Sequence, residues 1–449
     1  MSAAAHVSLR ARVRPHFTLE TAVRPHTLLL VGAGLSLLAW GVPWGGAIPA
    51  PLRGFAQAEP WTLHGALFLL AWYAFFFVVA IGGFQLGRRI PVLQRAERVS
   101  WESYYVFLSI VAVAGTAYAY GYVFAKSPHT ISQAFLHHEF NAVREILPFS
   151  SGPQTLRYAS CLAGAIAVFE LGRRRFHVLH VVNVVVLLLA AAIASRASVI
   201  IAAIIVAGLA ARHLHTVRVR PRRVVGMFLL GLVGLFLALT LLNYSRNADF
   251  YRSYSVRDPL VMSVDEMVRY LGIPFQAAVA VSNHVSTWPA APAAAAAGTR
   301  VFLLPTYVSK NLPASVSTGE NRYERVVAIP ASQTTNSVLA MSYGVFGALA
   351  FAVLGFAVLV AGVIAGHASR YRSYLFLASL VVAYSLAEWW RTYVLNQGIV
   401  HFLILVVVFW GLVGASADSW TGGRWSRFTH FLVVPEGRRR APWRAPRQT

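Results

Sequence analysis

The sequence predicts an all-α, polytopic integral membrane protein: a helical bundle of about ten transmembrane helices with one large outer loop. Three observations support this fold class. Of the 449 residues, 57% are hydrophobic and only 12% are charged, whereas a soluble domain is about one quarter charged. The apolar residues form long runs, most of them close to the ~20 residues that a helix needs to cross a bilayer. Basic residues form short clusters between these runs, on alternating sides.

Ten apolar runs predict the transmembrane helices. The fifth and sixth runs meet at Arg196, and the eighth is long enough to tilt or to contain an interfacial turn. The single cysteine, Cys161, lies inside an apolar run, which excludes an internal disulfide and a cysteine-based metal site. The ten runs cover residues 27–47, 63–86, 104–125, 155–172, 176–195, 197–211, 224–243, 336–366, 373–393 and 398–415.

The positive charge of the chain predicts its orientation. The net charge is +23, from 39 basic and 16 acidic residues. Nucleic-acid binding is one explanation of such a basic chain, but the basic clusters lie directly beside apolar spans, as on the inner side of a membrane protein. We therefore expect a multi-pass protein of the inner (plasma) membrane, with both termini in the cytoplasm and no nucleic-acid partner.

This topology divides the chain into five segments. The largest polar one is the loop 244–335, which carries several of the acidic residues and which we expect to form the roof of an active site, since long loops are usually functional. Within it, residues 264–286 have the apolar spacing of an interfacial or re-entrant helix, and the Ala/Pro-rich residues 290–297 are typical of a linker. The segments are a cytoplasmic basic N-terminus (1–26), transmembrane helices 1–7 (27–243), the extracytoplasmic loop (244–335), transmembrane helices 8–10 (336–415) and a cytoplasmic basic tail (416–449).

Arg196 stands alone between two apolar runs, in the sequence Ala-Ser-Arg-Ala-Ser. A charge in such a place is costly unless it faces water or a partner. In one interpretation its side chain extends to the outer headgroups. In the other it points inward to an anionic substrate, because the planar guanidinium fork matches phosphate oxygens. The residues alone leave both interpretations open.

Glu388 and Arg391 stand three residues apart near the outer end of the ninth span, beside Trp389 and Trp390. This spacing places the two charges on one face of a helix, where they can pair. The pair is either a structural contact within an interfacial aromatic belt or part of the lining of a pocket.

A dense run of charge, with Glu320, Arg322, Glu324 and Arg325, precedes the eighth span. It is either solvated surface or the wall of a site, in which the arginines bind phosphate and a carboxylate is the general base. His284 is the competing candidate for the base. No ligand cluster has the spacing of a metal site, and motifs for ATP-driven transport, serine hydrolysis and zinc proteolysis are absent. We therefore expect neither a metal nor a cofactor.

Several short motifs resemble the Wzy-type O-antigen and oligosaccharide repeat-unit polymerases. Residues 333–347 are similar to the family's Asn-x-x-Thr-like start followed by Asp-Phe-Gly-x-x-Gly, with a further glycine at Gly355. Here Ser342-Tyr343-Gly344 replaces Asp-Phe-Gly, so the family's aspartate has no counterpart. Residues 269–274, Arg-Tyr-Leu-Gly-Ile-Pro, resemble the family's Tyr-x-x-x-Pro helix. Arg196, followed by Gly208, resembles its Ser-Arg turn in an outer loop.

The resemblance implies a membrane-embedded, metal-independent glycosyltransferase that joins oligosaccharide units carried on undecaprenyl diphosphate at the outer leaflet. It implies membrane lipids, a flippase and a chain-length regulator as further partners. An O-antigen ligase and a transporter of lipid-linked or anionic solutes are the alternatives, although the two-half symmetry typical of transporters is not visible. Arg196, Glu320, Glu324 and His284 are the predicted catalytic residues. The predicted substrate-binding residues are Arg269, Tyr270, Arg322, Arg325, Glu388 and Arg391.

Overall fold

Every element in the described part of the computed structural model is a helix, which confirms the all-α class. The structure describes all residues except 1–18, 42–51, 53, 56, 94–99, 138–139, 149–151, 174, 195, 217–220, 286–291, 309–315, 317–322, 324–336 and 421–449. The longer helices are α2 (Pro25–Gly41), α4 (Leu63–Arg89), α5 (Trp101–Lys126), α9 (Ala159–Gly172), α10 (Val178–Ala194), α11 (Arg196–Thr216), α12 (Pro221–Ser253), α13 (Pro259–His284), α14 (Pro292–Leu303), α17 (Leu349–Ala368), α18 (Leu377–Ala387) and α19 (Gly398–Trp420). Shorter ones are α1 (Leu19–Ala22), α6 (Pro128–His137), α7 (Phe140–Ile146), α8 (Gly152–Thr155), the 3-10 turns η3 (Leu156–Tyr158) and η6 (Tyr374–Phe376), and α16 (Val338–Phe346).

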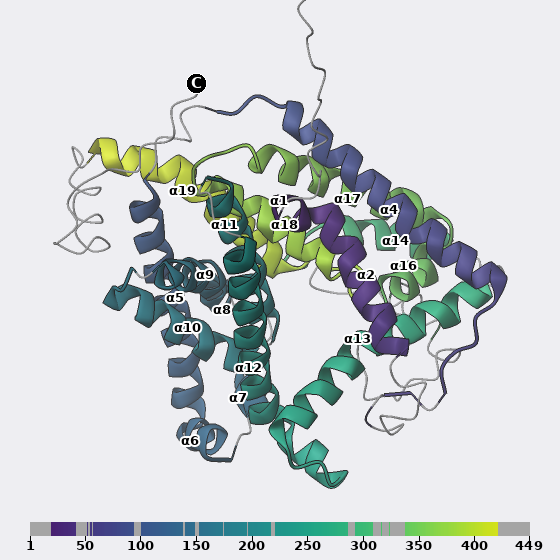
Figure 1. Cartoon of the computed structure of the whole chain (residues 1–449), viewed down its shortest axis with the longest axis horizontal. Coiled ribbons are helices and arrows are strands. Elements are labelled where there is room, and N and C mark those ends of the chain that lie inside the picture. The colour runs from purple at the N-terminus through teal and green to yellow at the C-terminus, as the bar shows by residue number, and fades with distance from the viewer. Residues whose placement is uncertain are drawn as a thin grey trace, which may run out of the picture.

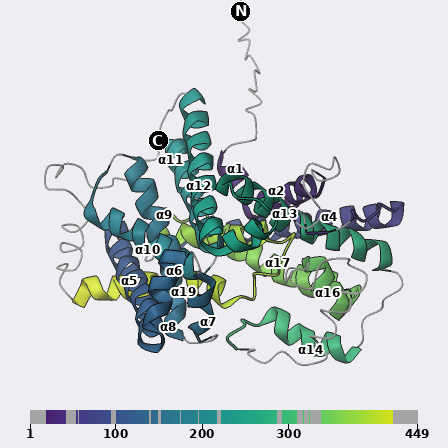
Figure 2. The same ribbon diagram turned by 90° about the horizontal axis from the view of Figure 1, so that it is seen from below.

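The helices form two groups that meet along α18 (Figures 1 and 2). One group contains α5, α9, α10, α11 and α19, which enclose a core with the first part of α18. The other contains α2, α4, α13, α14, α16 and α17, which enclose a second core with the chain just after α18, at Trp389 and Tyr393. The end of α18 therefore lies where residues from both groups can meet.

A described helix lies at each of the ten predicted spans, but the lengths differ. Four helices are long and apolar enough to cross a membrane by length and composition: α4, α5, α17 and the Arg196–Leu214 part of α11. The apolar helices at Pro25–Gly41, Val178–Ile193, Leu229–Ser245, Tyr374–Ala387 and Gly398–Gly411 are shorter. The membrane character of the chain is thus supported, while the number of crossings and the outer position of the large loop remain predictions.

The predicted eighth span is broken into α16 and α17 at Gly347. This glycine has a φ of 56°, a left-handed conformation that residues with a Cβ rarely adopt. Its N–H donates to the carbonyl of Tyr343, 2.8 Å away, and so closes the end of α16. Of the two possibilities for this long apolar run, the structure contains the turn.

Helices α4 and α17 pack backbone to backbone through paired small residues. A Cβ on Gly83 would lie 2.5 Å from the carbonyl oxygen of Leu359, and a Cβ on Gly366 would lie 2.0 Å from that of Phe84. Gly87 and Gly362 make the same kind of close approach. Each helix thus carries a Gly-x-x-x-Gly pair on the shared face, the arrangement that lets helices associate closely in membranes.

The segment 244–335 is largely helical where it is described. Helix α12 continues to Ser253. Helix α13 begins after Asp258, whose side chain accepts from the N–H of Leu260 at 2.7 Å and caps the helix. From Gly272 to Ser282 every residue of α13 is buried. This half of α13 packs against α2 and α4 and is a core element. A helix is therefore present in the described part of the predicted stretch 264–286, while its interfacial or re-entrant position remains a prediction.

The linker predicted at residues 290–297 is wrong for the described part of that stretch. Residues 292–297 form the first turns of α14. Alanine is the strongest helix former, and proline is favoured at the first helical position, so an alanine-rich stretch that begins with Pro292 favours a helix. The end of α14 is held in place because Asn396 Nδ2 donates to the carbonyl oxygen of Val301 at 3.1 Å.

Candidate functional site

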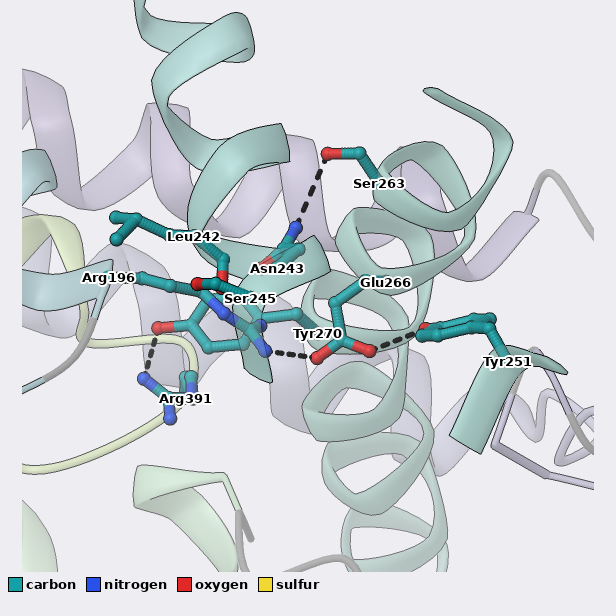
Figure 3. A network of polar contacts seen from close by, with 9 residues as sticks. All are labelled: Arg196, Leu242, Asn243, Ser245, Tyr251, Ser263, Glu266, Tyr270 and Arg391. Carbon is teal, nitrogen blue, oxygen red and sulfur yellow. Dashed lines mark hydrogen bonds and ion pairs between the residues drawn. The ribbon is translucent and has the colours of Figure 1, made fainter. Parts of the chain in front are cut away.

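Two arginines from different helix groups lie against the ring of Tyr270 (Figure 3). The guanidinium carbon of Arg391 is 4.0 Å from the ring centroid, and that of Arg196 is 5.5 Å from it. Tyr270 comes from α13, Arg196 is the first residue of α11, and Arg391 follows the end of α18. Cation–π contacts with one ring thus bring together three helices that are far apart in sequence. We name these residues and their polar partners the arginine–tyrosine cluster: Arg196, Tyr251, Glu266, Tyr270, Glu388 and Arg391.

Glu266 connects two of these residues. One of its carboxylate oxygens pairs with Arg196 Nη2, and the other accepts a hydrogen bond of 2.5 Å from the Tyr251 hydroxyl (Figure 3). Both partners are partly shielded from solvent, since the Arg196 side chain is 19% exposed and that of Glu266 is 12% exposed. A charge-assisted contact of this burial is stronger than a solvent-exposed ion pair.

The second carboxylate, Glu388, pairs with the second arginine. Its Oε2 lies 3.4 Å from Arg391 Nη1 and 3.5 Å from the Tyr270 hydroxyl. Arg391 Nη1 also donates a short hydrogen bond to that hydroxyl. Arg391 Nε is buried and has no hydrogen-bond partner among the described residues. The fork of Arg391 therefore has a donor that a ligand can use.

Local sequence positions each of these groups. Glu266 and Tyr270 are four residues apart on α13, so they lie on one face of the helix, one turn apart. Helix α18 ends at Ala387, and residues 388–391 form a turn closed by a 2.9 Å bond from the Arg391 N–H to the Glu388 carbonyl. The predicted pairing of Glu388 with Arg391 is therefore present, but in this turn rather than on a continuous helix face.

The formal charges of the cluster balance, with two guanidinium and two carboxylate groups. Burial raises the pKa of Tyr270 far above its ordinary value, so its hydroxyl stays protonated and neutral between the arginines. An anionic ligand that pairs with an arginine would compete with the carboxylate already there. A carboxylate freed in this way would be available to accept a proton.

Of the two other predicted site residues on α13, Arg269 lies at the edge of the cluster and His284 lies far from it. The guanidinium carbon of Arg269 is 4.6 Å from the ring centroid of Phe250, and Arg269 also interacts with Tyr251, at the edge of the cluster. His284 Nδ1 lies 2.8 Å from the carbonyl oxygen of Ala280. Because His284 is fourteen residues beyond Tyr270, it is roughly 21 Å further along the helix. His284 therefore cannot be the base for a reaction at the cluster.

Within the charged run before the eighth predicted span, the structure describes Tyr323. Glu320, Arg322, Glu324 and Arg325 lie outside the described residues, so their roles remain predictions. Tyr323, in the middle of the run, is 1% exposed and belongs to the same core as Trp389.

Glu266 and Tyr251 are not among the site residues predicted from the sequence. A signal for Glu266 was present, because it stands one helical turn before Tyr270 in a segment with helical spacing. Among the described residues, no group of three or more histidine, cysteine or acidic side chains is arranged to hold a metal ion.

Comparison of the chain with models of protein families, with curated proteins and with solved structures gives no match to any of them. The function is therefore inferred from the resemblance of the short motifs and from the geometry of the cluster.

Proposed function

We propose that this protein is a membrane glycosyltransferase that polymerises oligosaccharide repeat units carried on undecaprenyl diphosphate at the outer leaflet, forming a surface polysaccharide such as O-antigen or exopolysaccharide. The observation that carries the proposal is the pair of guanidinium groups on one half-buried tyrosine ring. Each lies within 5.5 Å of the same centroid. One diphosphate leaving group is the kind of ligand that needs two such forks.

In this proposal Arg196 and Arg391 bind the lipid diphosphate of the donor. The bond from the anomeric carbon to the diphosphate breaks, and negative charge develops on the leaving oxygen. Guanidinium groups fixed beforehand at that position stabilise this charge. Arginine suits the role better than lysine because its planar fork contacts two oxygens at once.

The bond that forms joins an acceptor sugar hydroxyl to the anomeric carbon, and the hydroxyl proton needs a base. Glu266 and Glu388 are the carboxylates within the cluster, and each is held by an arginine in the described state. Entry of the diphosphate would compete for these arginines and free a carboxylate. We therefore assign the general base to Glu266 or Glu388 in place of His284.

The deciding experiment is elongation by the purified protein. Supplied with an undecaprenyl-diphosphate-linked oligosaccharide and no nucleotide or metal, the wild-type protein is expected to release undecaprenyl diphosphate and to lengthen the glycan. Glu266→Gln and Glu388→Gln identify the base, since its loss costs about 10²–10⁴ in rate. His284→Ala is the matched control and is expected to retain activity.

Two other outcomes separate the alternatives. Transfer of the glycan only to a lipid-core acceptor, with no elongation, would identify a ligase. Movement of the lipid-linked oligosaccharide across a vesicle membrane without any new glycosidic bond would identify a transporter and refute the enzyme proposal.

A further inference from the structure

A third arginine, Arg157, lies buried in the helix group that contains α5 and α9. It belongs to the short turn η3 that precedes α9, and only 7% of it is exposed. Its Nη1 donates to Gln154 Oε1 at 3.3 Å and its Nη2 donates to the Tyr158 hydroxyl at 3.4 Å. Both partners are neutral. No carboxylate of a described residue pairs with Arg157, whereas Arg196 and Arg391 each have one.

Polar atoms around Arg157 lack partners as well. Arg157 Nε and Gln154 Nε2 are buried and make no hydrogen bond to the described residues. The same holds for Ser160 Oγ, one turn further along, and for Thr116 Oγ1 on α5. Helix α5 approaches η3 closely at the neighbouring Gly115, where a Cβ would lie 2.2 Å from the backbone nitrogen of Arg157. The surplus of donors in this region indicates an acceptor that the described residues do not supply.

The position of Arg157 makes a charge without a counter-ion energetically costly. Gly115 lies near the middle of α5, one of the four helices able to cross a membrane, so Arg157 lies beside the central part of that helix. A buried charge without a counter-ion is strongly unfavourable. Ionisable groups at such positions are kept mainly for binding or transport.

Arg157 is also linked in space to the arginine–tyrosine cluster. It interacts electrostatically with Cys161 on α9. Cys161 in turn interacts with Tyr384 on α18, and Tyr384 interacts with Tyr270 and Arg391. Cys161 and Tyr384 thus lie between Arg157 and the cluster in this series of electrostatic contacts.

We propose that Arg157, with Gln154 and Tyr158, binds a phosphate oxyanion. The guanidinium supplies the charge, and its unused Nε–H and the Gln154 amide supply further donors to the phosphate oxygens. The phosphate belongs either to a lipid diphosphate or to a free phosphate compound that enters from solvent. The inference rests on the surroundings of Arg157 alone, so it stands whether or not the chain is a glycosyltransferase.

The test uses Gln154→Glu in the full-length protein in detergent micelles. Because Gln154 Oε1 already lies 3.3 Å from Arg157 Nη1, a glutamate there supplies a built-in carboxylate that occupies the arginine. Calorimetric titration with inorganic diphosphate and, separately, with undecaprenyl diphosphate measures the number of sites and their affinities. We expect Gln154→Glu to lose one site or to weaken binding about 10- to 100-fold, the effect of one charge-assisted contact.

Arg157→Met is the second variant, since methionine is a long, unbranched apolar side chain. We expect it to lose the same binding while melting no lower than the wild type without ligand, because an uncompensated buried charge is removed. Arg144→Met is the matched control: Arg144 is exposed on α7, and its loss is expected to change neither property.

The titrations and the melting temperatures together distinguish the possible outcomes. Loss of binding for undecaprenyl diphosphate alone assigns the site to the lipid, and loss for both probes assigns it to phosphate in general. Diphosphate binding that is unchanged in Gln154→Glu and Arg157→Met overturns the proposal, as does a wild-type protein that binds neither probe. A large fall in the melting temperature of Arg157→Met together with unchanged binding in Gln154→Glu would show a structural arginine.

Discussion

Arg196 and Glu266 form an ion pair, yet the proposed function gives them different tasks, and this difference can be measured. Replacing Arg196 by alanine removes one guanidinium from the Tyr270 ring and leaves Glu266 with its 2.5 Å bond from Tyr251. Replacing Glu266 by glutamine also breaks the ion pair, but it leaves Arg196 in place beside Tyr270. Each variant therefore breaks the same ion pair by removing a different charged partner.

The loss of stability is expected to be similar for the two variants. The side chains are 19% and 12% exposed, so the pair is neither fully buried nor freely solvated. A hydrogen bond to a charged group contributes about 1.5–3 kcal/mol, and solvent screening reduces this for a partly exposed pair. We expect each substitution to lower the free energy of unfolding by roughly 1–2 kcal/mol, measured by denaturation in mixed micelles.

The effects on substrate binding are expected to diverge. Arg196→Ala should weaken binding of undecaprenyl diphosphate and lower the elongation rate by about 10²–10³, the cost of losing a contact to charge that develops in the transition state. Arg196→Lys should restore little, because a point charge replaces a planar fork. Glu266→Gln should bind the diphosphate at least as tightly as the wild type, since the competing carboxylate is gone.

The assay is the affinity for undecaprenyl diphosphate together with glycan length, each corrected for the amount of folded protein. If Arg196→Ala and Glu266→Gln weaken diphosphate binding equally, the pair has only a structural role and the reasoning is refuted. Full elongation by Arg196→Ala would return Arg196 to the interpretation in which its side chain extends to the lipid headgroups.

Three further predictions concern packing, the cluster and the topology. Gly83→Ala should destabilise the α4–α17 pair by about 1–3 kcal/mol through overpacking. The adjacent Gly82→Ala should change little, because nothing lies within 4 Å of its added Cβ; equal melting of the two variants would contradict the close approach. Tyr270→Phe should cost about 1.5–3 kcal/mol of stability, since Arg391 loses an acceptor while the ring remains, and an unchanged unfolding free energy would argue against that bond. With Cys161 replaced by alanine, Ser369→Cys should resist a membrane-impermeant thiol reagent added from outside, and labelling would refute the predicted orientation.

The sequence predicted several residues of the cluster individually, but it did not predict that they lie in contact. Arg196 was conspicuous because a lone charge between apolar runs needs an explanation, and Glu388 with Arg391 because of their spacing. That Arg196 and Arg391 lie against one ring depends on how α11, α13 and α18 pack, and contacts between residues so distant in sequence leave no periodic signal.

Helix α13 shows why apolar runs alone do not predict every buried helix of this chain. Its acidic residues, Gly272 and Pro274 interrupt the run, so the sequence predicts a loop that contains an interfacial or re-entrant helix. Its second half is nevertheless buried, because its polar groups have partners within the fold. Gln276 Oε1 accepts from Trp40 Nε1 at 2.6 Å, and the carbonyl of Leu271 accepts from Ser36 Oγ at 2.6 Å. Burial of polar groups is tolerated when they are hydrogen-bonded, and those partners become known only from the structure.

The three arginines differ in whether an anion that binds them must displace a carboxylate. An anion that reaches Arg157 meets no described carboxylate, so binding there displaces nothing. An anion at Arg196 or Arg391 must compete with Glu266 or Glu388. If one lipid-linked substrate uses both positions, attachment at Arg157 makes the second contact intramolecular, which raises its effective concentration. The competing carboxylate would then be freed only when a diphosphate is already in place, so the base would become available when there is a donor to attack.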